Sequence, residues 1–447
     1  MGQRRKILTE IVGFRGWIVR EAFFENAEGQ QVQPLAGYDV IQGTRLVLRM
    51  ERRWAPRCSR CGAICSRGAH EVLKTRRWQD LEWAGHTVFL EATPIRVKCK
   101  RCQASPPEML AWAEPHDRQT TRLQNRLAIE AASMPVLHVA ALHAMTWSAV
   151  RRAEGAALKR WSETRPIVQL YRVGVDEKWL GRRHKRGYQY VTIVSNLDTG
   201  EPVWIGNSRG KETLQSWIGT LTPEQKAGIV LFAMDMYEPF YAAVRSDEAL
   251  AHAVIVHDPF HLMKRANAAI TEMRKETFFR AGPEMRAIGR GSRWLVLRAW
   301  ERCTDEQRTK LRLLFSYNPK LARAYQVVEE FREVLVDAPD GSAMAVGLRR
   351  ILRRTQAHAN KPLRSFHKSL RYHMNEILAL AEHRPPVGRI EALNNNWETL
   401  VRRARGYRDL DYLFLKLRFM TVNPIRTTDG VRRFAALGLQ APVAHAA

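Results

Sequence analysis

Alternating apolar and polar residues divide the amino-terminal part of the chain into short strands. The segments GWIVREAFF and TRLVLRMER alternate within residues 1–55, on either side of the polar stretch NAEGQQVQPLAGYD. The same alternation returns in HTVFLEATPIRVKCK. Because alternation with a period of two is typical of half-buried strands, a small β-rich module is predicted here.

From residue 118 the apolar positions follow the period of a helix. Breaks at Ser133-Met134-Pro135 and around Met145-Thr146 divide this stretch into three short predicted helices, TTRLQNRLAIEAAS, VLHVAALHAM and WSAVRRAEGAALKRW. The segment RPIVQL follows and is predicted to be a linker.

Apolar runs of strand length come next: YRVGVDEKWL, YQYVTIVSNL, EPVWIGNS, IVLFAMDM and AVIVHD. Turn residues join the first three runs, as in hairpins, whereas the last two alternate with helical stretches. This order predicts an α/β fold with a mixed sheet. Residues 260–384 carry only helical periodicity, and a last helical segment, IEALNNNWETLVRRAR, follows Pro385-Pro386.

The charge of the chain favours a polyanionic partner. Lys and Arg number 72 against 45 Asp and Glu, a formal net charge of +27 over 447 residues. Nucleic acid is therefore the first candidate partner. No apolar run reaches the roughly 18 to 20 residues of a membrane span, and the first residues lack a signal-peptide core, so we expect a cytoplasmic protein without a membrane partner.

Four cysteines form two CxxC pairs, Cys58 with Cys61 and Cys99 with Cys102. Two such pairs can close a tetrahedral thiolate shell around zinc, and four protein ligands would make that zinc structural. Cys65 or His70 could replace one ligand. The alternative is that these residues are small buried side chains or a redox pair.

The three predicted helices after residue 118 fit a helix-turn-helix, whose last helix enters the major groove. The residues at the start of that helix that could read bases are Thr146, Ser148, Arg151 and Arg152. A plain helical packing unit would show the same pattern.

Two aspartates interrupt apolar strands. Asp176 lies within VGVDE, and Asp235 closes the strand in VLFAMDMYEPF. A charge in an apolar strand is costly unless it is paired or bound to metal, and two divalent cations held by carboxylates can cut and join phosphodiesters. A helix cap or turn residue is the alternative for each aspartate.

Taken together, several segments resemble the ISL-three family of bacterial insertion-sequence transposases, which belong to the DDE class. They are CSRCG, CKRCQ, VGVDEKWL, AMDMYEPF, HDPFHLMKRAN, SYNPKLARAYQVVEEFREV and IEALNNNWETLVRRARGYRDLDYLFLKLRF. The resemblance covers nearly the whole chain. It implies a ribonuclease-H-like core that a helical insertion interrupts before the third acid, and magnesium or manganese bound by Asp176, Asp235 and Glu391.

Glu391 also fits this role on physical grounds, because it follows a Pro-Pro break and can project from the final helix onto the sheet edge. A helix-start glutamate favoured by the helix dipole is the alternative. A basic run on the same segment could hold phosphates or could be a solvated face: Arg402, Arg403, Arg405 and Arg408. Asp258 and His261 could support the acids or form a helix cap and its neighbour.

The expected fold is a multidomain α/β protein with a ribonuclease-H-like mixed sheet and a large helical insertion, preceded by a β-rich zinc module and a helix-turn-helix. The expected domains are a zinc module (1–115), a helix-turn-helix (116–165), the first part of the core (166–270), the insertion (271–386), the final helices of the core (387–430) and a tail (431–447).

The expected function is that of a transposase that binds terminal inverted repeats and cuts and joins DNA. Its partners would be double-stranded DNA, both element ends and target, and further copies of itself in a homodimer or larger synaptic oligomer, with the protein at the nucleoid. A zinc-containing regulator without catalysis and a ribonuclease-H-like nuclease are the competing interpretations.

Overall fold

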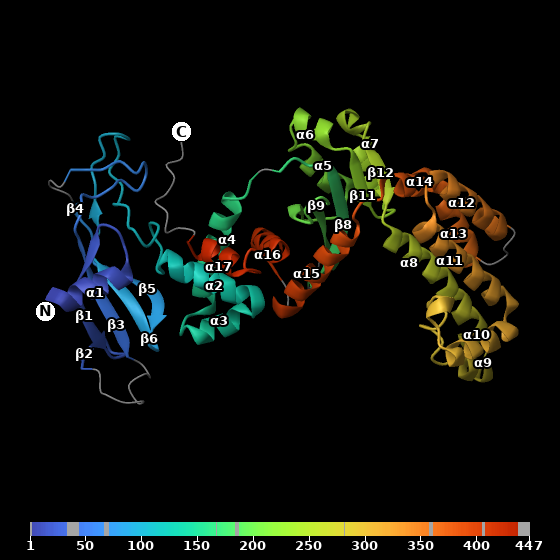
Figure 1. The fold of residues 1–447 in the computed structure, drawn as a ribbon, viewed down its shortest axis with the longest axis horizontal. Coiled ribbons are helices and arrows are strands. Elements are labelled where there is room, and N and C mark those ends of the chain that lie inside the picture. Colours follow the sequence, from blue (N-terminus) through green and yellow to red (C-terminus); the bar gives the residue numbers. More distant parts are fainter. Residues whose placement is uncertain are drawn as a thin grey trace. The chain divides into compact units, whose positions relative to one another are not determined.

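The computed structural model describes residues 2–33, 44–66, 71–166, 168–183, 187–280, 282–356, 361–404 and 407–436. His70 and Arg405 lie outside these ranges. The chain forms two compact units, one made of Met1–Ile167 with Thr399–Ala447 and the other of Val168–Glu398 (Figure 1). None of the described helices is both long and apolar enough to cross a membrane.

The first unit begins with a five-stranded sheet of order β2-β1-β3-β6-β5. Its strands are β1 (Trp17–Glu25), β2 (Gln31–Val32), β3 (Arg45–Arg52), β5 (Arg76–Trp83) and β6 (His86–Ala92). The alternation predicts only strands over residues 1–55, but Gly2–Val12 form helix α1. Leu8 and Val12, one helical turn apart, pack into the core of the sheet and explain this helix.

Three helices follow the sheet: α2 (Thr121–Ser133), α3 (Val136–Leu142) and α4 (Trp147–Glu163). Thr120 and Thr146 cap α2 and α4, because each side-chain oxygen accepts a hydrogen bond from a backbone N–H of the first turn. Helices α16 (Leu410–Val422) and α17 (Thr428–Ala436) complete this helical cluster.

A buried ion pair joins α4 to α16. The Lys416 ammonium lies 2.6 Å from the Glu154 carboxylate, and the Tyr412 hydroxyl donates to the same carboxylate. Both charged side chains are almost fully buried. Since an unpaired buried charge is strongly destabilising, this contact fixes how the carboxyl-terminal helices dock on α4.

The second unit is built on a five-stranded mixed sheet of order β10-β9-β8-β11-β12. Its strands are β8 (Arg172–Arg183), β9 (Gly187–Asn196), β10 (Pro202–Gly206), β11 (Leu231–Met234) and β12 (Val254–His257). β8, β9 and β10 pair antiparallel, whereas β11 is parallel to both β8 and β12. The mixed α/β fold is therefore confirmed, and this order is compatible with a ribonuclease-H-like core.

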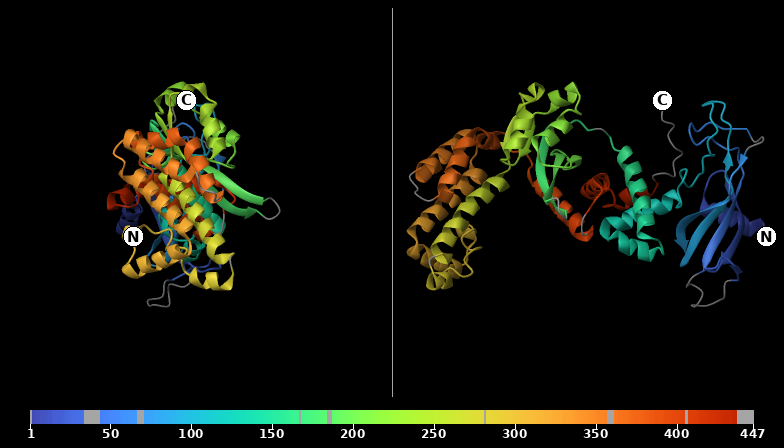
Figure 2. Two further views of the ribbon diagram at one scale, coloured as in Figure 1. Left: turned by 90° about the vertical axis from the view of Figure 1, so that its right-hand side faces the viewer. Right: turned by 180° about the vertical axis from the view of Figure 1, so that it is seen from behind.

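Helices surround and extend this sheet. α5 (Lys211–Ile218), α6 (Pro223–Gly228) and α7 (Glu238–Arg245) connect strands, and α5 and α7 correspond to the helical stretches that the sequence predicts there. After β12 come α8 (Pro259–Arg274), a π-helical turn (Lys275–Phe279), α9 (Pro283–Ile288), α10 (Asp305–Tyr317), α11 (Pro319–Asp337), α12 (Gly341–Gln356), α13 (Lys361–Tyr372) and α14 (Met374–His383). Several of these helices lie side by side (Figure 2).

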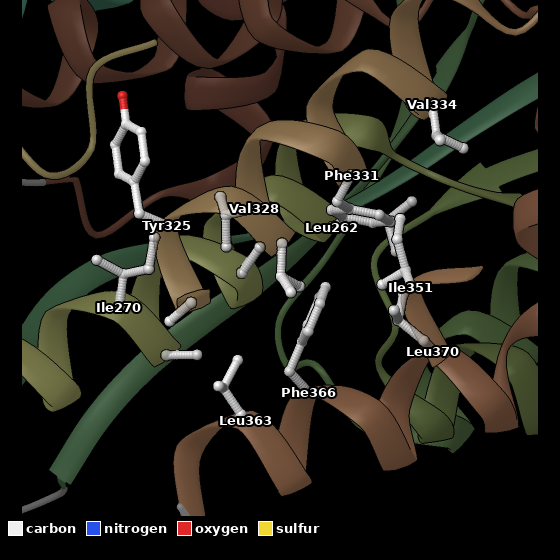
Figure 3. Packing of buried hydrophobic residues seen from close by; sticks show 14 of the residues in the cluster. Leu262, Ile270, Tyr325, Val328, Phe331, Val334, Ile351, Leu363, Phe366 and Leu370 are labelled. Atoms are coloured by element: carbon white, nitrogen blue, oxygen red, sulfur yellow. The ribbon is translucent and has the colours of Figure 1, made fainter. Parts of the chain in front are cut away.

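The helices after β12 share one apolar core. Leu262 of α8, Phe331 of α11, Ile351 of α12 and Phe366 of α13 point toward one another within it (Figure 3). The chain then returns to the sheet through α15 (Gly388–Ala404), whose Ile390 packs into a small cluster with residues of β11 and β12.

Two buried histidines connect the sheet to the inserted helices. The Nε2 atom of His257, at the end of β12, lies 3.0 Å from Nδ1 of His373, which precedes α14. Burial, and then the repulsion that a protonated His373 would exert, lowers the pKa of His257 to about 4. Burial also lowers the pKa of His373. Both imidazoles are therefore neutral in the folded protein at neutral pH.

We expect this pair to make the second unit sensitive to acid. Folding favours the neutral form of His257. The stability of the folded unit that depends on this neutral form is therefore complete above the ordinary histidine pKa of about 6.5 and is lost as the pH falls toward 4. Protonation of His257 lowers the free energy of unfolding by about 3 kcal/mol at most. Denaturant unfolding between about pH 7 and about pH 5 should show a steeper decline in wild type than in His257→Asn. The exposed His252→Asn is the control, and equal slopes in wild type and His257→Asn would contradict this expectation.

Candidate active site and metal-binding residues

The two aspartates predicted from strand patterns lie side by side. In the parallel pairing of β8 with β11, Val175 is opposite Met234. Asp176 directly follows Val175 and Asp235 directly follows Met234 in the sequence. Neighbouring strands of a sheet are about 4.8 Å apart. The sheet therefore brings both carboxylates to one place, although they are far apart in the sequence.

Three donors fix the carboxylate of Asp176, which is 7% exposed. Its Oδ2 accepts a hydrogen bond from Asn394 Nδ2 at 2.9 Å and lies 2.8 Å from the Lys178 ammonium. Its Oδ1 accepts from the backbone N–H of Glu177 at 2.7 Å. The first strand and the last helix of the unit thus meet at this carboxylate.

His261 holds Asp235. The Nδ1 atom of His261 lies 2.8 Å from Asp235 Oδ2, and the backbone N–H of Met236 donates to Oδ1 at 2.6 Å. Burial alone would raise the pKa of Asp235, but the hydrogen bond and charge of His261 lower it overall. Burial likewise works to lower the pKa of His261, whereas the contact with Asp235 raises it. Each of the two groups therefore favours the charged form of the other.

Asp258 caps α8. Its Oδ1 accepts a hydrogen bond from the backbone N–H of Phe260 at 2.9 Å. Burial raises its pKa, and the nearby charges of Asp176 and Asp235 act in the same direction. Of the two roles considered for these residues, Asp258 has that of a helix cap and His261 supports an acid.

The two candidates for the third acid lie on α15, on either side of Asn394. Glu391 is three residues before Asn394 and Glu398 is four residues after it, so both share the face of the helix that reaches Asp176. The ligand atoms of Asp176, Asp235 and Glu391 are not among the groups that fall within 4.8 Å of one another in the described part of the chain. The assignment of Glu391 stays a prediction.

Sequence reasoning missed Lys178, Asn394 and Arg209. Lys178 lies two residues after Asp176, so the period of a strand puts both on one face. Arg209 lies 3.2 Å from the Glu177 carboxylate, and its guanidinium stacks on Tyr190. Burial raises the pKa of Glu177 despite this arginine. Only the Lys178 contact had a local signal in the sequence, since the others join distant segments.

The four cysteines of the CxxC pairs converge in the first unit, and their Sγ atoms lie within 4.8 Å of one another. The Sγ atoms of Cys58 and Cys102 are 3.7 Å apart, and those of Cys61 and Cys99 are 3.4 Å apart. Thiolates about 2.3 Å from a tetrahedral zinc would be separated by nearly these distances. This donor set therefore fits zinc.

Cys65 stands outside this group. Its thiol lies 3.7 Å from the carbonyl oxygen of Ala63, and burial raises its pKa. By contrast, a hydrogen bond from the backbone N–H of Cys102 lowers the pKa of Cys99 to about 6. Among the described residues of this module, the group that could hold a metal ion therefore consists of the four thiols of the CxxC pairs.

The residues predicted to read DNA lie at the start of α4. Thr146 and Ser148 are exposed, and their side-chain oxygens are 3.2 Å apart. Arg151 pairs with Asp409 at 2.5 Å and lies over the ring of Tyr412. Arg152 is exposed and donates to the carbonyl of Ser148. Arg151 therefore contributes to packing between helices, whereas Arg152 faces solvent.

The basic run at the end of α15 is largely exposed. Arg402, Arg403 and Arg408 are exposed, and Arg403 donates to the carbonyl of Ala132 at 2.9 Å. The fourth member of the run, Arg405, lies outside the described residues.

Comparisons with known proteins agree with this arrangement. The model of the ISL-three family of DDE transposases, described as "Transposase", matches residues 173–417. The transposase of insertion sequence element IS1001 from Bordetella parapertussis is 28% identical over 365 residues, which are 81% of this chain and 87% of that protein. The transposase of IS1557 from Mycobacterium tuberculosis (strain CDC 1551 / Oshkosh) is 28% identical over 409 residues, covering 83% of this chain and 87% of its own.

The family match begins at Val173 in β8, three residues before Asp176, and ends within α16. It includes the two aspartates, the inserted helices and α15, and it covers more than half of the chain. The protein therefore belongs to the ISL-three family of DDE transposases and is a transposase of an insertion sequence.

Proposed function

We propose that this transposase binds the terminal inverted repeats of its element and cuts and joins DNA at a centre made of Asp176, Asp235 and Glu391. The observation that carries this proposal is the pairing of β8 with β11, which puts Asp176 and Asp235 on adjacent strands. Two carboxylates at one sheet edge provide the hard oxygen ligands that magnesium and manganese prefer.

The residues around the two acids would keep them in place for this chemistry. Asn394 and Lys178 hold Asp176, and His261 holds Asp235. A pair of magnesium ions bound there would activate the attacking oxygen and stabilise the leaving oxygen. Carboxylates that are already fixed would need little reorganisation during the reaction. Avoiding this reorganisation is how a preorganised site enhances the rate.

We assign the other two functional parts to the first unit. The four thiols of the CxxC pairs would hold one structural zinc, since four protein ligands leave no position for water. α2, α3 and α4 would act as a helix-turn-helix that reads the element's ends. Because two ends must be joined, the working species would be a homodimer or larger synaptic oligomer on nucleoid DNA.

Incubation of a pre-cut element end with plasmid DNA and magnesium tests the proposal. Joined product is expected from a transposase, and cleavage without joining would instead indicate a nuclease. Binding without either reaction would indicate a DNA-binding regulator. The last two results would overturn the proposed strand transfer.

Replacing Arg151 and Arg152 together by Ala should weaken binding to the element's ends more than binding to random duplex. Base contacts carry sequence information, and each bidentate contact discriminates by about 1–3 kcal/mol, whereas phosphate contacts do not discriminate. Titration of both duplexes with the variant gives the two affinities.

The contact between Arg151 and Asp409 provides a control for this experiment. Asp409→Asn breaks the ion pair and leaves both arginines in place, while Arg152→Ala leaves the ion pair intact. Loss in Arg152→Ala on element ends, with little change in Asp409→Asn, supports base reading. Equal loss on both duplexes would instead indicate phosphate contacts, and no loss would remove α4 from the interface.

A further inference from the structure

Helices α12 and α13 have an unusual charge distribution. Neither helix contains Asp or Glu. Their basic residues are Arg349, Arg350, Arg353 and Arg354 in α12 and Lys361, Arg364, Lys368 and Arg371 in α13. α11, which packs against α12, mixes both signs. The positive charge of the inserted helices is thus concentrated on two neighbouring helices.

The apolar sides of both helices are turned into the core. Ile351 of α12 and Leu363, Phe366 and Leu370 of α13 are buried there (Figure 3). Because successive helical residues are about 100° apart, Arg349 and Arg353 lie on the side of α12 away from this core.

Contacts with neighbouring helices show which of the exposed basic residues are already paired with a carboxylate. Arg350 and Arg354 both pair with Glu330 of α11, so they lie on the α11 side of α12. On the other side, Thr355 Oγ1 lies 2.9 Å from His367 Nδ1 and joins α12 to α13.

The outward residues that flank this junction are Arg349 and Arg353 of α12 and Arg364, Lys368 and Arg371 of α13, which we call the α12–α13 basic face. All five side chains are exposed. None of them has a carboxylate within ion-pair distance in the part of the chain that the structure describes.

The spacing of these charges is unfavourable for the isolated helices. Arg349 and Arg353 are four residues apart, as are Arg364 and Lys368, and like charges at this spacing repel each other. A solvated face usually mixes both signs, as α11 does. A polyanion bound along this face would relieve the repulsion.

We propose that the α12–α13 basic face binds the phosphate backbone of duplex DNA, an inference that rests on the DNA binding, cutting and joining proposed above. Arg364, Lys368 and Arg371 form a stripe about 10 Å long, since each helical residue advances 1.5 Å. That length covers about three base-pair steps of 3.4 Å along a DNA strand. These basic side chains project from the sides of the helices and not from a helix end that could enter a groove. Such a surface suits contacts to the phosphate backbone of DNA, which carry no sequence preference.

The test replaces Arg353, Arg364 and Lys368 together by Gln in the full-length protein. Fluorescence anisotropy measures binding to a pre-cut element end and to random duplex over a range of salt concentrations. We expect affinity for both duplexes to fall roughly tenfold, and the slope of log affinity against log salt to become shallower by about 2 to 3. A loss confined to joining, with end binding intact, would assign the face to target DNA.

A matched control separates local contacts from net charge. The variant with Arg290, Lys320 and Arg323 replaced by Gln removes the same charge from exposed positions elsewhere among the inserted helices. It should bind both duplexes as wild type does. Equal losses in the two triple variants, or no loss in either, would overturn the proposal.

Circular dichroism melting shows whether the first triple variant is folded. If it is not, Arg349→Gln with Arg371→Gln tests the same face, with a slope change of about 2 expected. The wild-type joining assay separates the two hypotheses. Normal joining together with unchanged binding by the face variants rejects the basic face alone, whereas absence of joining by wild type rejects the proposed strand transfer.

Discussion

Asp176→Asn, Asp235→Asn and Glu391→Gln should each abolish strand cleavage and joining while leaving binding to element ends intact. Each change keeps the shape of the side chain and removes the charge that would hold the catalytic cations. A loss of about a thousandfold or more is expected, since single contacts to developing charge are already worth 10²–10³. Joining of a labelled pre-cut end into plasmid, measured beside end binding, provides both readouts.

Glu398→Gln is the matched control for the third acid. Glu391 and Glu398 are seven residues apart on one face of α15, or roughly 10 Å along the axis, so they cannot be equally close to one pair of cations. Glu398→Gln should retain activity. Full activity in Glu391→Gln, or an inactive but folded Glu398→Gln, would reverse the assignment.

The second large effect is expected at the four thiols. Cys58→Ser combined with Cys99→Ser removes one ligand from each CxxC pair, and the module should then lose its zinc and its local fold. Structural zinc sites contribute about 10–16 kcal/mol to folding in small modules, which few apolar contacts could replace. Metal analysis gives the zinc content of the purified protein, and limited proteolysis detects unfolding of the module.

Cys65→Ser is the control for the zinc prediction, because this thiol lies beside the four but contacts the carbonyl of Ala63. It should retain about one zinc per chain, as structural sites use four ligands. Unchanged zinc content and end binding in the double variant would show that the thiols are ordinary buried side chains.

The sequence predicted the strands of the sheet well because each is a short apolar run with turn residues on both sides. Asp176 and Asp235 were recognisable because a charge in such an apolar run is costly unless it is paired or bound to metal. The neighbours that hold them were harder to predict. Asn394 approaches Asp176 from a helix more than 200 residues away, and no local periodicity records that contact.

The packing role of Arg151 was hidden for the same reason. Its position at the start of a predicted recognition helix suggested a base-reading residue, and the structure shows in addition that it pairs with Asp409. α1 shows a different limit of the sequence patterns. Its apolar residues are confined to the second half of the helix, and the decision between helix and strand depended on the sheet against which Leu8 and Val12 pack.

The buried pair of Glu154 and Lys416 has a consequence for the order of events during synthesis. Glu154 of α4 leaves the ribosome 262 residues before its ionic partner on α16. Until then Glu154 can be satisfied only by water, so α4 cannot reach its final burial. Such long-range contacts close slowly. We infer that the helical cluster of the first unit is completed last, and that a nascent or prematurely terminated chain without residue 416 would lack the finished helical cluster to which we assign recognition of the element's ends.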